Sequence, residues 1–172
     1  QSQGGLSRED QANFDNCEGA VDRPDVRIAA CRNIWLAFGK EGITPSPHDG
    51  SVLAYYEGSA WFQKGDYDQA IEKYGDAVTM DSKNSFAYHG LAIAYMKKRN
   101  FVGAMGAFNR EAGRAPDNFK GLNTVAWALA TVPEEGDRDG AIAVKLASVA
   151  AERSKWKDAE GLDTLAAACA EA

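Results

Sequence analysis

The sequence predicts an all-α fold built from repeated helix hairpins. It contains 30 alanines among 172 residues, against 15 valines and isoleucines together. Alanine is the best helix former, whereas β-branched residues favour strands. The chain also repeats itself, because a shift of 34 positions places residues 51–84 on residues 85–118 with small residues on small ones and aromatic residues on large apolar ones. These two observations predict successive copies of one helical unit.

Each copy is expected to contain two helices. In the first copy Lys64-Gly65-Asp66 interrupts the helical pattern, because glycine accepts the left-handed conformation of a helix end and aspartate caps the next helix. The following helix is predicted over residues 67–80. Ala70, Tyr74 and Ala77 have the i, i+4, i+7 spacing of one helix face, so this face is expected to be buried.

The start and end signals of the second copy are less regular. Ser51 and Ser85 stand at equivalent positions and are predicted to be N-caps. Arg99-Asn100 replaces the Gly-Asp pair of the first turn, and Pro116 is expected to end the last helix of the copy because proline lacks an amide donor.

Weaker copies are expected on both sides of this pair. Residues 119–157 are interpreted as a degenerate repeat in which the turn 133–137 is lengthened, with Ala143, Ala147 and Ala150 on its buried face. Around these copies the sequence predicts a flexible N-terminus over 1–6, a helical hairpin over 7–41, a linker over 42–50 and a capping helix over 159–172. The hairpin has Pro24 in the first turn of its second helix and Asp22 as that helix's expected cap. The total is about nine helices.

The segment GSAWFQKGDYDQAIEKYGDAVTMDSKN carries a family resemblance. It resembles a tetratricopeptide repeat (TPR), with the family's signature residues at Gly58, Trp61, Gly65, Tyr67, Ala70, Tyr74 and Ala77. The resemblance implies a right-handed α-solenoid of antiparallel helix hairpins, strongly for residues 51–118 and weakly elsewhere. It also implies that the first helices of the repeats line a concave groove that binds a partner protein.

Cys17 and Cys31 fall on the two helices of the N-terminal hairpin and are both expected to face its interior. A disulfide and two buried thiols remain alternatives. The segment ending in PDVRIAAC is similar to an N-terminal module of exported TPR proteins of α-proteobacteria, which implies the disulfide and an oxidising compartment. The resemblance therefore implies a periplasmic or secreted protein. The start at Gln1 fits either a removed leader or a sequence that begins internally. Cys169, on the last helix, is expected to be a small buried residue.

Composition and motif searches exclude several functional classes. The net charge of −6 argues against binding to nucleic acid and to anionic membranes, and no apolar run is long enough to span a bilayer. The two histidines, His48 and His89, have no metal-ligand spacing, and no phosphate-binding loop or nucleophile motif appears. His48 and the acidic turn around 134–139 are interpreted as solvent-exposed. We therefore expect no enzyme, no cofactor and no metal site.

The expected function is that of a protein-interaction scaffold or adaptor. Carried over from the family, the groove positions are Tyr55, Ser59, Phe62, His89, Ile93, Met96, Lys97, Asn123, Trp127 and Ala130. This set is aromatic and apolar, which suits a peptide or an amphipathic helix of a partner. Two alternatives remain open. The aromatic residues can instead cover one another, and the unpaired last helix can stack on another copy, making the chain a structural or self-assembling subunit of an envelope complex.

Overall fold

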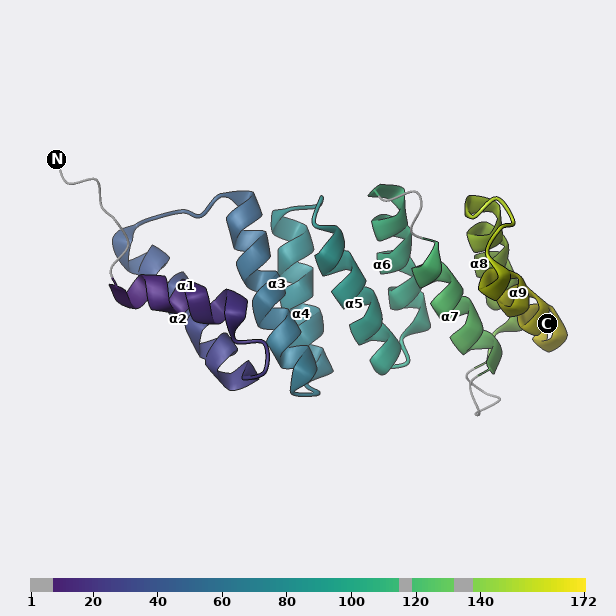
Figure 1. Ribbon diagram of the computed structural model, residues 1–172, viewed down its shortest axis with the longest axis horizontal. Coiled ribbons are helices and arrows are strands. Elements are labelled where there is room, and N and C mark those ends of the chain that lie inside the picture. The colour runs from purple at the N-terminus through teal and green to yellow at the C-terminus, as the bar shows by residue number, and fades with distance from the viewer. Residues whose placement is uncertain (1–7, 115–118, 132–137) are drawn as a thin grey trace. The chain divides into compact units, whose positions relative to one another are not determined.

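A computed structural model describes residues 8–114, 119–131 and 138–172, without the side chains of 111–114 (Figure 1). These residues form nine helices and no strand, so the predicted all-α fold is confirmed. The helices are α1 (Arg8–Gly19), α2 (Pro24–Glu41), α3 (Pro47–Gln63), α4 (Tyr67–Met80), α5 (Ser85–Lys97), α6 (Phe101–Arg114), α7 (Lys120–Thr131), α8 (Gly140–Arg153) and α9 (Ala159–Glu171). None of the described helices is long and apolar enough to cross a membrane.

The helices fall into two units, Gln1–Ala94 and Tyr95–Ala172. In the first unit α1 pairs with α2 and α3 pairs with α4, and α2 also packs on α3. In the second unit α7 packs on both α8 and α9, and α8 packs on α9. Three predicted features lie outside the described residues: the N-terminus 1–6, the stop at Pro116 and the turn 133–137.

The hairpin of α3 and α4 confirms the predicted turn. Gly65 has a φ of +79°, a left-handed conformation in which glycine carries no steric penalty. Asp66 caps α4 by accepting a hydrogen bond from the Gln69 amide at 3.1 Å. The helix runs from Tyr67 to Met80 as predicted, and Ala70, Tyr74 and Ala77 are its buried face.

The next turn has the same geometry with different residues. Arg99 has a φ of +57°, which is uncommon for a residue with a Cβ. The Asn100 side chain then caps α6 by accepting a hydrogen bond from the Gly103 amide at 2.9 Å. The departure from Gly-Asp to Arg-Asn therefore keeps the turn, because asparagine caps as well as aspartate and the backbone tolerates one left-handed arginine.

The predicted cap at Ser51 is wrong, because α3 begins one turn earlier. Ser46 is the N-cap and accepts a hydrogen bond from the Asp49 amide at 3.1 Å. Pro47 occupies the first helical position, where its missing amide costs nothing and its fixed φ favours the helix. The linker between α2 and α3 is therefore shorter than the expected 42–50, because it ends before Pro47.

The predicted cap at Ser85 is also wrong, because Asn84 caps α5. Its Oδ1 accepts a hydrogen bond from the Ala87 amide at 3.0 Å, while its Nδ2 donates to Ser51 Oγ at 2.9 Å. Ser51 is buried and donates in turn to the Ala77 carbonyl at 2.8 Å. The serine and the asparagine thus join α3, the end of α4 and the start of α5 through one chain of hydrogen bonds.

The N-terminal hairpin is closed by a disulfide between Cys17 and Cys31, whose sulfurs are 2.07 Å apart and buried. Pro24 begins α2, as expected, but Arg23 precedes it without a side-chain capping bond, so the expected cap at Asp22 is wrong. The backbone instead continues directly from the short turn after α1, with the Arg27 amide bonded to the Arg23 carbonyl at 3.0 Å.

Arg27 holds this hairpin together and joins it to α3. Its Nε donates to the Cys17 carbonyl at 2.8 Å and its Nη2 to the Glu18 carbonyl at 3.1 Å. These carbonyls lie in the last turn of α1, where carbonyls lack helical partners and a cation is favourable. The guanidinium also stacks 4.8 Å from the ring centre of Tyr56 in α3. The buried arginine therefore has its hydrogen-bonding groups engaged.

In the second unit, Ala143, Ala147 and Ala150 of α8 are buried, as predicted. On α9 the buried residues are Gly161, Thr164 and Ala168. The expectation that Cys169 is buried is wrong, because it lies beside Ala168 on the exposed side. The buried face of α9 is made of small residues because the helix approaches its neighbours closely: a methyl group at Gly140 would lie 2.5 Å from the Ala172 amide nitrogen.

Reducing the disulfide should lower the free energy of unfolding by about 3 kcal/mol, because the bridge closes a short loop of the unfolded chain. Urea unfolding of the oxidised and reduced protein measures the difference. The paired variant Cys17→Ser/Cys31→Ser should unfold like the reduced protein, whereas Cys169→Ser should unfold like the oxidised one. An intact mass unchanged by reduction, with three alkylatable thiols, would contradict the bridge.

Candidate functional site

The candidate site is built around Tyr74, which projects from α4 between α3 and α5. A methyl group placed on Gly58 of α3 would lie 2.9 Å from Tyr74 Cδ1, and one on Gly90 of α5 would lie 2.6 Å from Cζ. Both distances are too short for carbon atoms in contact. The tyrosine ring can therefore pack against both helices only because these two positions have no side chain.

The environment of Tyr74 keeps its hydroxyl protonated. Burial, followed by the neighbouring Tyr55, raises the pKa of Tyr74 to about 12, while a hydrogen bond with Ser59 and the charge of Arg27 act in the opposite direction. Ser59 also lies 3.5 Å from Arg27 Nη1, which donates to its hydroxyl. Ser59 was predicted to face the groove, but these contacts engage it with the interior of the unit.

A cavity lies over this tyrosine and brings four predicted groove residues together. Its volume is about 270 Å³, and its lining consists of Tyr55, Phe62, Tyr74, Phe86, His89, Gly90 and Ile93. Tyr55, Phe62, His89 and Ile93 were expected from the sequence. The residues come from three consecutive helices, so the cavity exists only when α3, α4 and α5 are packed.

Phe86 is the exposed residue of this cavity that the predicted groove set lacks; the other two are Gly90 and the buried Tyr74. Its side chain is 73% exposed, although its ring centre lies 6.2 Å from that of Tyr55. Tyr55 packs in turn against Tyr74, with 5.8 Å between ring centres. The aromatic residues therefore cover one another in part and leave Phe86 at the surface. Its i, i+3, i+7 spacing with His89 and Ile93 was the signal available in the sequence.

The remaining predicted groove residues lie further along the chain. Met96 and Lys97 are in the last turn of α5. Asn123 and Trp127 of α7 line a second cavity of about 360 Å³ within the second unit, together with Thr124 and with Glu160, Asp163 and Thr164 of α9. Ala130 does not belong to this surface, because it is buried.

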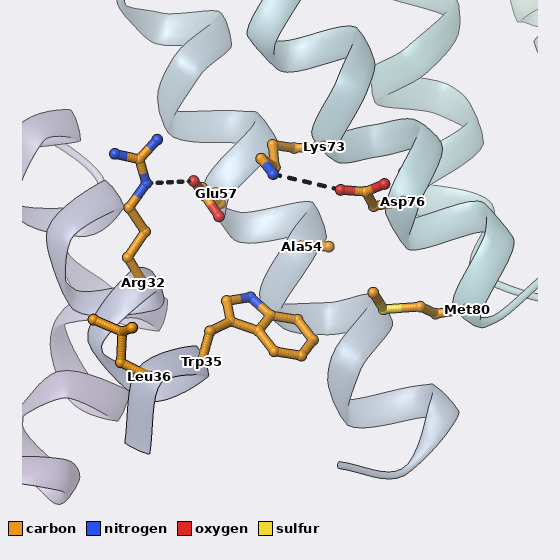
Figure 2. Close-up of a pocket in the computed structure, with 8 residues that line it drawn as sticks. All are labelled: Arg32, Trp35, Leu36, Ala54, Glu57, Lys73, Asp76 and Met80. Carbon is orange, nitrogen blue, oxygen red and sulfur yellow. Dashed lines mark hydrogen bonds and ion pairs between the residues drawn. The ribbon is translucent and has the colours of Figure 1, made fainter. Parts of the chain in front are cut away.

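A third cavity, of about 460 Å³, lies among α2, α3 and α4 and was not anticipated (Figure 2). At one end Arg32 contacts the buried carboxylate of Glu57 at 3.0 Å, and Lys73 lies 3.5 Å from Asp76. The other end is apolar, with Trp35, Leu36 and Met80 as its labelled side chains. Burial lowers the pKa of Lys73, but the carboxylates of Glu57, Asp76 and Glu72 outweigh it and raise the pKa overall. The ionic end is thus internally neutralised.

The described residues contain no group of three or more potential ligands placed to hold a metal ion. His48, expected in an irregular loop, is instead in the first turn of α3 and remains exposed. Its Nδ1 lies 3.4 Å from Asp81 Oδ2. The Lys83 amide, which donates to Asp81, and the nearby His48 lower the pKa of this carboxyl.

Comparison with known proteins identifies the class of repeat. Residues 58–98 match the family model described as a TPR repeat, and this range covers the end of α3 and all of α4 and α5. Residues 58–98 thus contain a repeat of the tetratricopeptide class within an all-α fold, and the resemblance of the first repeat is confirmed.

Two solved structures share the fold. One is described as a MamA RS-1 ArsTM double mutant, with 11% identity, a TM-score of 0.64, and coverage of 97% of this chain and 96% of that one. The other, described as a crystal structure of MamA, has 18% identity, a TM-score of 0.52, and coverage of 90% and 98%. A comparison of the sequence with curated proteins found no match.

Gly90→Ala should destabilise the first unit by about 1–3 kcal/mol, because the added methyl group overlaps the Tyr74 ring and the packed helices must move apart. Gly75→Ala is the matched control, since a methyl group there would have no atom within 4 Å. Alanine should stabilise α4 at that position by up to about 1 kcal/mol. Chemical unfolding monitored by circular dichroism measures both, and equal stabilities would contradict the packing described.

Proposed function

We propose that this protein is a non-catalytic interaction scaffold that binds an apolar or amphipathic segment of a partner in the cavity of α3, α4 and α5. The observation that carries the proposal is the exposure of Phe86 beside a cavity whose floor is the buried Tyr74. Large exposed apolar side chains beside a concave surface are typical of contact sites. The TPR match supports the same class of function, and four of the groove residues that the sequence predicted line this cavity.

The lining of the cavity determines the chemistry of the proposed partner. It consists of aromatic, aliphatic and glycine residues together with His89, and has neither a lysine nor an arginine. A partner's terminal carboxylate would therefore lack the cationic groups that normally bind it. Side chains such as leucine or phenylalanine would instead be removed from water against Tyr55, Phe62 and Ile93. An amphipathic helix presents such anchors at i, i+3 or i+4.

We further propose that the protein works in an oxidising compartment, the periplasm or the cell exterior. The disulfide between Cys17 and Cys31 supports this assignment, because such bridges persist in oxidising environments and are rare in the cytosol. In that setting the N-terminal hairpin would stay closed while the cavity over Tyr74 engages its partner.

The alternative function, a self-assembling structural subunit, is supported by a different surface. In the second unit Trp156, Leu162 and Val149 are exposed large apolar residues on or beside α8 and α9. Exposed large apolar residues on neighbouring helices are typical of surfaces that bind another protein, which here would be a second copy of the chain.

Phe86→Ala should weaken capture of the partner by about 10- to 100-fold, since a central aromatic anchor contributes about 1–3 kcal/mol to an interface. The measurement is quantitative pull-down from an extract of the native source, with mass spectrometry of the retained proteins. Leu36→Ala is the matched control, because Leu36 is 70% exposed and lines the cavity of Figure 2 instead. If Leu36→Ala abolishes capture of the partner and Phe86→Ala does not, the partner binds in the cavity of Figure 2 and the proposal is contradicted.

Self-assembly predicts a mass that rises with protein concentration. Light scattering should then show oligomers that Trp156→Ser reduces, because this substitution removes exposed apolar surface without touching the Tyr74 cavity. A constant monomer mass at every concentration would contradict the structural-subunit alternative and leave the scaffold proposal intact.

A further inference from the structure

We propose that the cavity between α7 and α9 binds an arginine side chain of a partner protein. This inference concerns a second site with its own chemistry, and it does not require the cavity over Tyr74 to function. It goes beyond the sequence analysis, which placed Asn123 and Trp127 in an aromatic and apolar groove. The structure adds two carboxylates to these residues and so changes the kind of ligand that fits.

The cavity has a volume of about 360 Å³ and lies within the second unit. One wall comes from α7, with Asn123, Thr124 and Trp127, and the other from α9, with Glu160, Asp163 and Thr164. The two helices pack directly on each other, so the positions of these side chains are set by regular secondary structure and not by a loop.

The polar groups of the cavity are mainly hydrogen-bond acceptors. The Thr124 hydroxyl already donates to the Lys120 carbonyl at 2.9 Å, and the Thr164 hydroxyl donates to the Glu160 carbonyl at 2.9 Å. Their oxygens therefore remain only as acceptors. Asn123 Oδ1 is buried and has no hydrogen-bond partner. An unpaired buried acceptor is costly, so a ligand that brings several donors would relieve a deficiency of the free protein.

The two carboxylates also lack cationic partners. Within the described part of the chain, neither Glu160 nor Asp163 forms an ion pair, whereas Glu171 on the same helix contacts Arg138 at 3.3 Å. Glu160 lies in the first turn of α9, where the helix dipole favours an acid. The dipole does not account for Asp163 one turn further on, or for the unpaired Asn123. A cation supplied by a partner would pair with Glu160 and Asp163 and would donate a hydrogen bond to Asn123.

Trp127 favours a guanidinium as that cation. Its side chain is 49% exposed, and among the described residues no ring or cation is stacked on it. An indole face attracts cations, and a guanidinium stacks on it flat while its N–H groups reach neighbouring oxygens. Arginine is also more weakly hydrated than lysine, so it loses less on entering the cavity. The net charge of −6 would attract a basic partner to the surface.

Nuclear magnetic resonance tests the site with the whole oxidised chain. The probe is the peptide acetyl-Gly-Arg-Gly-amide, and the readout is the indole N–H signal of Trp127, assigned by comparison with Trp127→Phe. We expect a saturable shift that weakens as salt is added. The citrulline peptide keeps the shape without the charge and should bind at least about fivefold more weakly, because charge-assisted hydrogen bonds are lost.

Substitutions separate this site from general electrostatic attraction. Asp163→Asn and Glu160→Gln should each weaken the arginine peptide about threefold, the range of a partly exposed ion pair. Glu152→Gln is the matched control: it removes one exposed negative charge from α8, outside the cavity, and should leave binding unchanged.

A further probe, acetyl-Gly-Lys-Gly-amide, offers the positive charge without the flat guanidinium and should bind more weakly than the arginine peptide. Four results would overturn the inference: no saturable shift, equal binding of the citrulline peptide, equal binding of the lysine peptide, or equal weakening by Glu152→Gln. Phe86→Ala should not affect this titration. If the arginine peptide does not bind but Phe86→Ala still weakens capture of the partner, only this site is disproved. If the peptide binds but Phe86→Ala has no effect on capture, only the proposed function of the first unit is disproved.

Discussion

Tyr74 enters between α3 and α5 at the two points where those helices present glycine, and the first unit depends on this contact. Gly58 and Gly90 allow the ring to approach to distances that any Cβ would block. The same ring then forms the floor of the aromatic cavity, and its hydroxyl shares Ser59 with the network of Arg27. Packing and candidate function are therefore coupled, because a change that displaces Tyr74 alters the helix spacing and the shape of the cavity together.

The sequence was informative where backbone geometry or helical periodicity alone decides the structure. The turn at Gly65-Asp66 and the buried face of α4 follow from backbone geometry and helical periodicity, so they could be predicted. The caps at Ser51 and Ser85 were wrong because both serines were judged by residue type alone. Ser46 and Asn84 have the same capping chemistry, and the choice between them depends on where the backbone begins to turn. Ser51 was then free to bond across helices, which no local pattern reveals.

The candidate sites depend on long-range packing and were predicted less completely. Tyr55, Phe62, His89 and Ile93 were found because the repeat period places first helices in register. Phe86 lies one helical turn before His89, at a position that is not among the groove positions carried over from the family. Glu160 and Asp163 were missed for a different reason. The sequence analysis expected Cys169 to be buried, whereas the small residues Gly161, Thr164 and Ala168 are the ones buried on α9. Only small side chains fit where α9 packs closely on its neighbours. With these residues buried, Glu160 and Asp163 lie on the side of α9 that lines the cavity with α7.

The two cavities differ in chemistry because different residues face α3 and α7, the first helices of their hairpins. These residues come from α5 in the first unit and from α9 in the second. In the first unit α5 supplies Phe86, His89 and Ile93 opposite the aromatic residues of α3, and the resulting surface is apolar. In the second unit α9 supplies Glu160, Asp163 and Thr164 opposite Trp127, and the surface becomes one of acceptors beside an indole. Repetition of a hairpin therefore fixes where cavities form, while the exposed residues of the adjoining helix determine what can bind. The two cavities share no residue, so each can be changed without the other.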